Sequence, residues 1–158
     1  MTAVLLSAHV LAGIVLIGPI TAAASVFPRY ARAATVGDPA AASAAAASAA
    51  AMHRISRGYA VPAIAVPLLG IVTASLLGAL TQAWVLVSMA LTLVAAVLLV
   101  ARIVPQQRHL LARLGGRAPA AVVDADSRRL ATTTGMFALT WAVVVVLMIV
   151  RPGSTTHV

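Results

Sequence analysis

Residues 58–80 carry no charged side chain and read GYAVPAIAVPLLGIVTASLLGAL. About 20 apolar residues in a helix cross a hydrocarbon layer about 30 Å thick. Because lipid offers the backbone no hydrogen-bonding partner, such a segment must be helical to pair its own N–H and C=O groups. Pro62 and Pro67 each remove one of those pairings, so we expect a bend near residues 62–67.

Three further apolar runs have a similar length, at residues 3–27, 84–104 and 130–150. Hydrophobic residues make up 62 % of the chain and charged residues 9 %, whereas about 25 % are charged in an ordinary soluble domain. The sequence thus predicts an all-α fold in which residues 1–158 form a single integral membrane domain, a four-helix transmembrane bundle. Pro28 is expected to end the first span. The short turn at residues 81–83 predicts a tight antiparallel hairpin of the second and third spans.

An alanine-rich tract at residues 40–57 lies in the connection before the second span. Alanine has the highest helix propensity, and Asp38-Pro39 is typical of a helix start. We therefore expect a long helical extension on the cytoplasmic side before the second span. Disorder of the tract is the alternative, and the sequence leaves open whether this helix continues into the second span.

The connection between the third and fourth spans contains two different segments. Residues 106–116 (QQRHLLARLGG) are amphipathic and suit the membrane surface. Residues 117–129 are expected to form a polar linker in which Asp124 or Asp126 caps the last helix.

All eleven basic residues are arginine, and all but Arg151 lie in the two long connections. The positive-inside rule then places both connections in the cytoplasm and both termini outside. Since this topology accounts for the basic charge, we expect no nucleic-acid partner. The arginines suit anionic lipid head groups or an acidic partner surface, and those expected to make such contacts are Arg54, Arg57, Arg102, Arg108 and Arg113.

Small residues recur every four positions in the second and third spans. Gly70, Ala74 and Gly78 share one helical face, and Ser88 and Thr92 repeat the spacing in the next span. Such spacing lets two backbones approach closely. We expect packing against the first or third span, with the docking of a second protein as the alternative.

His9 is the one ionisable side chain well inside an apolar run, and such residues are by default functional hypotheses. An imidazole nitrogen could bind haem b or copper. The alternative is a histidine that is hydrogen-bonded to a neighbouring helix. His53 is the second possible ligand, although its position before the second span places it at a different depth.

His9 and Gly13, early in the first of four spans, resemble the pattern of small bacterial integral membrane proteins, some of them related to the copper-resistance CopD family. The resemblance covers the span layout and, besides these two residues, His53. It implies a multi-pass protein of the bacterial plasma membrane with a metal or haem role for His9.

Several classes of chemistry have no residues to support them. The chain has no cysteine and no glutamate, and its three aspartates lie outside the apolar runs. This composition excludes disulfides and thiolate metal sites, and we expect no enzymatic activity. The leading hypothesis is a non-catalytic accessory subunit that packs against and stabilises a larger membrane complex, such as a transporter or a respiratory assembly. The alternatives are a b-haem or copper-binding protein that uses His9, and a small-molecule permease component.

Overall fold

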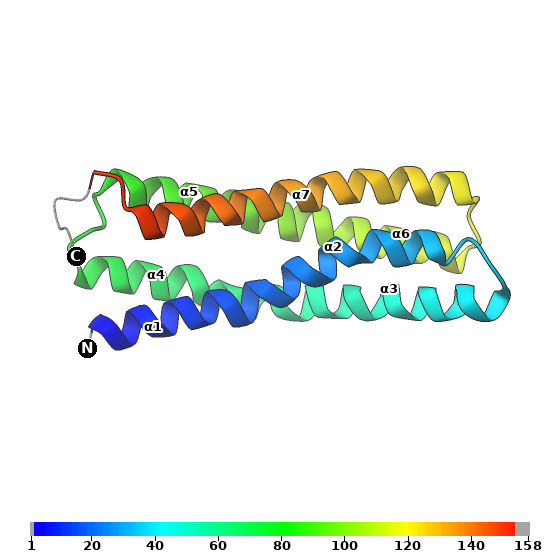
Figure 1. The fold of residues 1–158 in the computed structure, drawn as a ribbon, viewed down its shortest axis with the longest axis horizontal. Coiled ribbons are helices and arrows are strands. Elements are labelled where there is room, and N and C mark those ends of the chain that lie inside the picture. Colours follow the sequence, from blue (N-terminus) through cyan, green and yellow to red (C-terminus); the bar gives the residue numbers. More distant parts are fainter. Residues whose placement is uncertain (1, 154–158) are drawn as a thin grey trace.

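The computed structural model describes residues 2–153, and over this range the chain forms helices without any strand. The predicted all-α class is therefore confirmed. Four helical rods run side by side along the long axis, and successive rods point in opposite directions (Figure 1). The start of the first rod and the end of the last rod lie at the same end of the molecule (Figure 1).

The first rod consists of α1 (Thr2–Ala12), a π-helical turn (Gly13–Ile17) and α2 (Gly18–Ala33). The prediction that Pro28 ends this helix was wrong, because Pro28 lies buried inside α2. Other buried side chains of α2 include Ala24, Phe27 and Ala31. The free energy of this burial outweighs the single hydrogen bond that a proline removes.

The second rod consists of α3 (Pro39–Ala60), a 3₁₀ turn (Pro62–Ile64) and α4 (Ala65–Leu76), with a bend of 40° between α3 and the remainder. The break lies at Val61, directly before the interval near which the bend was predicted, and the alanine-rich tract is helical as predicted. Asp38 caps α3, since its Oδ1 accepts the backbone N–H groups of Ala40 at 2.9 Å and Ala41 at 3.0 Å. These two donors hold the pKa of Asp38 below its ordinary value.

The helix of the second span ends at Leu76 rather than at Leu80. Gly78 adopts a φ of +63°, which favours glycine, and the N–H of Ala79 bonds the carbonyl of Ala74 at 2.9 Å. This is the geometry of a glycine-terminated helix. Gly78 therefore serves the turn and does not belong to a helical packing face.

The third rod consists of α5 (Ala83–Val97), a π-helical turn (Leu98–Ile103) and α6 (Val104–Gly115), and the fourth rod is α7 (Ala120–Val150). Two predictions for this part were wrong. Residues 106–116 do not form a separate surface piece, because residues 106–115 belong to α6 and include the buried side chains of Gln107 and Leu110. Only residues 117–119 of the predicted linker connect the two helices, because residues 120–129 belong to α7, and Pro119 rather than an aspartate precedes that helix.

The hydrophobic core concentrates in the half of the molecule built from α2, α3, α6 and the first part of α7. Phe27, Leu110, Val123 and Leu130 are among its fully buried side chains. In the other half, α1 packs on α4 and α5 packs on α7 (Figure 1). The predicted hairpin of α4 and α5 is in contact mainly near its turn, where Ala74, Ala79 and Val85 form a small separate cluster.

Three of the rods are long and apolar enough to cross a membrane, at 32, 33 and 31 residues, and the bent second rod adds a fourth if both parts count as one span. At 1.5 Å per residue, such rods are about 45–50 Å long and exceed a hydrocarbon layer of about 30 Å. The molecule is thus compatible with a multi-pass membrane protein in which about a third of each rod projects beyond the lipid.

Candidate functional site

His9 lies buried on α1, against the part of α4 that follows the bend. Its Nδ1 is 3.0 Å from the carbonyl oxygen of Val66. Because a carbonyl only accepts hydrogen bonds, Nδ1 carries the proton and donates it. The imidazole occupies space left by Gly70, where an added Cβ would be 2.9 Å from the ring carbon Cε1 of His9. His9 is thus hydrogen-bonded to a neighbouring helix, in agreement with the second of the two interpretations of the sequence.

His53 belongs to a different cluster, which joins α3 to α6. Its Nδ1 is 3.2 Å from Oε1 of Gln107, and Nε2 of Gln107 donates to Oγ of Ser56 at 3.3 Å. Ser56 and Gln107 are fully buried, so this polar network lies inside the core. Sequence reasoning missed Gln107, although it follows Leu99 and Ile103 and precedes Leu110 at the spacing of a buried helical stripe.

The structure does not bring His9 and His53 together. His9 contacts Val66, and about 20 Å of helix separates Val66 from His53 along the second rod. Within residues 2–153 there is no cluster of three or more histidine, cysteine or acidic side chains that could hold a metal ion.

The small residues of the second and third spans do not act as one docking face. Gly70 contacts His9 on α1, and Ala74 contributes to the cluster at the α4–α5 turn. Ser88 is buried on α5, which packs on α7, and Thr92 donates to the carbonyl of Ser88 at 2.7 Å. The four-residue spacing therefore supports packing within the chain, chiefly between α4 and α1.

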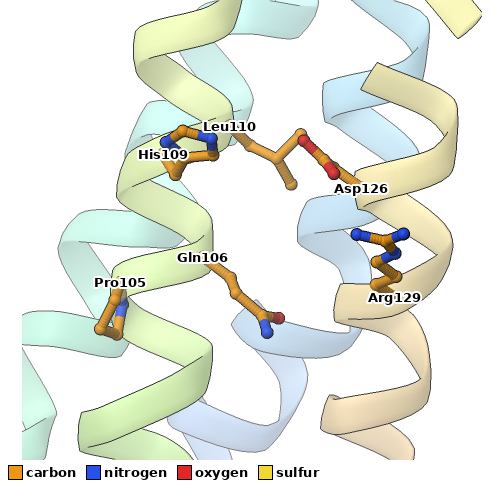
Figure 2. A pocket seen from close by; sticks show the side chains of 6 residues that line it. All are labelled: Pro105, Gln106, His109, Leu110, Asp126 and Arg129. Carbon is orange, nitrogen blue, oxygen red and sulfur yellow. The ribbon is translucent and has the colours of Figure 1, made fainter. Parts of the chain in front are cut away.

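A cavity of about 310 Å³ lies between α6 and α7 and is lined by polar and apolar side chains. Gln106 extends into the space between the two helices, and Asp126 and Arg129 lie across from it on α7 (Figure 2). Pro105, His109 and Leu110 complete the lining. The Oε1 atom of Gln106 is buried and has no hydrogen-bonding partner.

Two aspartates of α7 form ion pairs with arginines of the neighbouring helices α6 and α2. Nε of Arg113 on α6 lies 2.9 Å from Oδ2 of Asp126 as an ion pair, and it donates its single hydrogen to Nε2 of His109 at 3.0 Å. Asp124 pairs with Arg128 at 2.9 Å and lies 3.8 Å from a guanidinium nitrogen of Arg32 on α2. These contacts replace the capping role that the sequence suggested for the two carboxylates.

Of the arginines expected to contact lipid or a partner, all but Arg102 lie on the well-packed half of the molecule. Arg54 and Arg57 are exposed on α3, Arg102 is exposed in the π-helical turn, and Arg108 is exposed on α6. Arg113 differs from them, since its Nε lies against Asp126 and donates to His109.

Arg151 lies at the opposite end of the molecule from these arginines, directly after α7. Its guanidinium carbon is 5.8 Å from the centre of the Trp84 ring, within the range of a cation–π contact. Arg151, the one arginine outside the two long connections, therefore has an aromatic partner close by.

No protein-family profile, curated protein or solved structure matches this chain. The resemblance to the CopD family accordingly stays a prediction.

Proposed function

We propose that the chain is an integral membrane protein of the bacterial plasma membrane that crosses the bilayer four times. The arginine-bearing half, which consists of the end of α2, the alanine-rich residues 40–57 of α3, α6 and the first part of α7, lies on the cytoplasmic side, and both termini lie outside. In this location the protein is a non-catalytic accessory subunit that packs against, and stabilises, a larger complex such as a transporter or a respiratory assembly.

The main support for this proposal is that the molecule has two different halves, the arginine-bearing half and an apolar half that consists of α1, α4, α5 and the last part of α7. Large apolar side chains are exposed along the helices of the apolar half, with Leu139 at 69 %, Leu93 at 67 % and Leu68 at 57 %. Only 17–22 % of the most apolar window of each long rod is buried within the chain. Exposed apolar surface of this extent suits lipid and the apolar surfaces of other integral subunits.

The arginine-bearing half offers a second kind of contact, between its exposed arginines and a partner protein. Because the rods exceed the hydrocarbon thickness, residues 40–57 of α3 and the ends of α2 and α6 project into the cytoplasm in the proposed orientation. Their exposed arginines, such as Arg54, Arg57 and Arg108, suit an acidic surface on a cytoplasmic part of the same complex.

Purification in a mild detergent tests this function. We expect the chain to be recovered with at least one other integral membrane protein. A photo-reactive residue at Leu139 or Leu93 should cross-link to that protein, whereas the same residue at Ala125, which is exposed in the arginine-bearing half, should not cross-link to its membrane-spanning part. Recovery solely as a monomer or homo-oligomer, without cross-links, would contradict the proposal.

One observation favours a second function, the binding of b-haem or copper. Metal-binding histidines commonly donate one ring N–H to a carbonyl and bind the metal with the other nitrogen, and His9 donates from Nδ1 in this way. An optical spectrum of the purified protein tests whether it binds b-haem or copper. A Soret band, or a copper-dependent band, that disappears in His9→Ala would establish this function.

A further inference from the structure

The cavity between α6 and α7 lies where the arginine-bearing half meets the apolar half. Arg129 lines it, and the apolar run of α7 begins at the next residue, Leu130. On α6, Pro105 lines the cavity just after the apolar run of the third rod. In the membrane location proposed above, on which this inference rests, that level corresponds to the phosphate groups of the cytoplasmic leaflet.

The charged groups of the cavity leave one positive charge without a partner. The Asp126 carboxylate is ion-paired with Arg113 at 2.9 Å, although its buried Oδ2 accepts no hydrogen bond from the described part of the chain. Arg129 is exposed on the cavity rim and forms no ion pair among the residues that the structure describes. A guanidinium in this position is a strong hydrogen-bond donor to a phosphate oxygen.

The wall opposite Arg129 offers a hydrogen-bond acceptor. Oε1 of Gln106 is buried in the protein and unpartnered, and leaving such a group unpaired costs free energy. A ligand that donates a hydrogen bond to this oxygen would remove that cost. The cavity of about 310 Å³ lies at the lower end of the range for small-molecule sites, about 300–1,000 Å³.

From these features we propose that the α6–α7 cavity binds the head group of a phospholipid with one negative charge and free hydroxyl groups, that is, of the phosphatidylglycerol class. The phosphate diester contacts Arg129, and a head-group hydroxyl donates to Oε1 of Gln106. The apolar surface of α7 that begins at Leu130, directly after Arg129, receives the start of the acyl chains. The site thus recognises an anion and a hydrogen-bond donor in one ligand, which a general attraction between arginines and an acidic membrane does not require.

Lipid competition on the isolated chain tests this site. The protein is inserted into phosphatidylcholine nanodiscs that contain small amounts of phosphatidylglycerol or phosphatidylmethanol, which has the same charge but no head-group hydroxyl. Lipids retained after mild extraction are counted by native mass spectrometry. We expect phosphatidylglycerol to be retained about fivefold better than phosphatidylmethanol, and better still than phosphatidylcholine.

Two substitutions separate the two interactions. Arg129→Gln should reduce the preference for both anionic lipids over phosphatidylcholine about tenfold, and Arg129→Lys should restore most of it. Gln106→Leu should abolish the difference between phosphatidylglycerol and phosphatidylmethanol while leaving the preference for anions. Arg108→Gln removes an exposed arginine of α6 that does not line the cavity, and it should change neither preference.

Three results would overturn the proposal. Equal retention of phosphatidylglycerol and phosphatidylmethanol by the unaltered chain would exclude recognition of the hydroxyl. An equal loss in Arg108→Gln and Arg129→Gln would indicate diffuse surface charge. Displacement of the lipid by millimolar inorganic phosphate would assign the cavity to a soluble anion. Failure of the chain to insert into phosphatidylcholine nanodiscs would instead contradict the membrane location, and failure to recover a partner protein would contradict only the subunit role.

Discussion

The contact between His9 and Gly70 gives the sharpest test of how α1 and α4 are held together. The substitution Gly70→Ala would place a Cβ 2.9 Å from Cε1 and 3.4 Å from Nδ1 of His9. A separation of 2.9 Å is too short for two carbon atoms, so the imidazole must move. Because Nδ1 is hydrogen-bonded to the carbonyl of Val66 at 3.0 Å, movement of the ring weakens that bond as well.

The expected cost follows from three contributions. Overpacking of this kind destabilises by about 1–3 kcal/mol, and the loss of a buried hydrogen bond adds about 1 kcal/mol. The higher helix propensity of alanine returns about 1 kcal/mol. Gly70→Ala should therefore lower the free energy of unfolding by about 1–3 kcal/mol, which corresponds to a decrease in melting temperature of roughly 2–10 °C for a chain of this size.

A double-mutant cycle in detergent solution attributes this cost to His9. Thermal unfolding is measured for Gly70→Ala, for His9→Ala and for the double variant. Once the ring is absent, Gly70→Ala should be neutral or stabilising, so the coupling free energy should exceed about 1 kcal/mol. Gly135→Ala is the matched control, because nothing lies within 4 Å of its added Cβ on α7 and the substitution should stabilise the helix. The reasoning is refuted if Gly70→Ala costs the same with and without His9.

Three further substitutions test other contacts. Gln107→Leu leaves Ser56 and His53 without their shared partner and should lower stability by about 1–3 kcal/mol, measured by chemical unfolding; an unchanged midpoint would contradict the network. The folded-state pKa of Asp38 is lowered, so its stabilisation of α3 is present above the ordinary value of 3.8 and is lost as the pH falls through the lower folded-state value. The protection factors of the amides at the start of α3, which correct for the intrinsic pH dependence of exchange, should accordingly fall on acidification, but not in Asp38→Ala, where they should already be low near neutral pH. Arg117 has a φ of 54°, which is unfavourable for side chains other than glycine, so Arg117→Gly should raise stability by about 0.5 kcal/mol; a lower unfolding midpoint would contradict this.

Local chemistry was sufficient for several features of the fold. Asp38-Pro39 predicted the start of α3, and the alanine propensity predicted its helical character. Pro62 and Pro67 predicted approximately where along the chain the 40° bend lies. These features depend on hydrogen bonds and torsion angles within a few residues, and the types of neighbouring residues are sufficient to predict them.

Helix ends were predicted poorly wherever tertiary burial opposes a local signal. Pro28 is a helix-breaking residue, yet α2 passes through it because the surrounding face is buried. Residues 120–129 are polar enough for a linker, yet they are helical, with Val123 and Ser127 buried and Asp124 and Asp126 paired with arginines of other helices. The burial and the ion pairs that stabilise these helix ends come from segments distant in the sequence, so a local sequence pattern cannot predict them.

The sequence by itself determined the all-α class, the apolar runs, the proline bend and the separation of the arginines from the apolar surface, because each depends on composition or on near neighbours along the chain. Only the tertiary structure decided the partners: His9 with Val66 and Gly70, His53 with Gln107, and Arg129 with the α6–α7 cavity. Partner choice depends on how four rods pack and rotate about their axes. Many rotations bury similar apolar area, so hydropathy alone does not select among them, whereas a single imidazole that fits over a single glycine does.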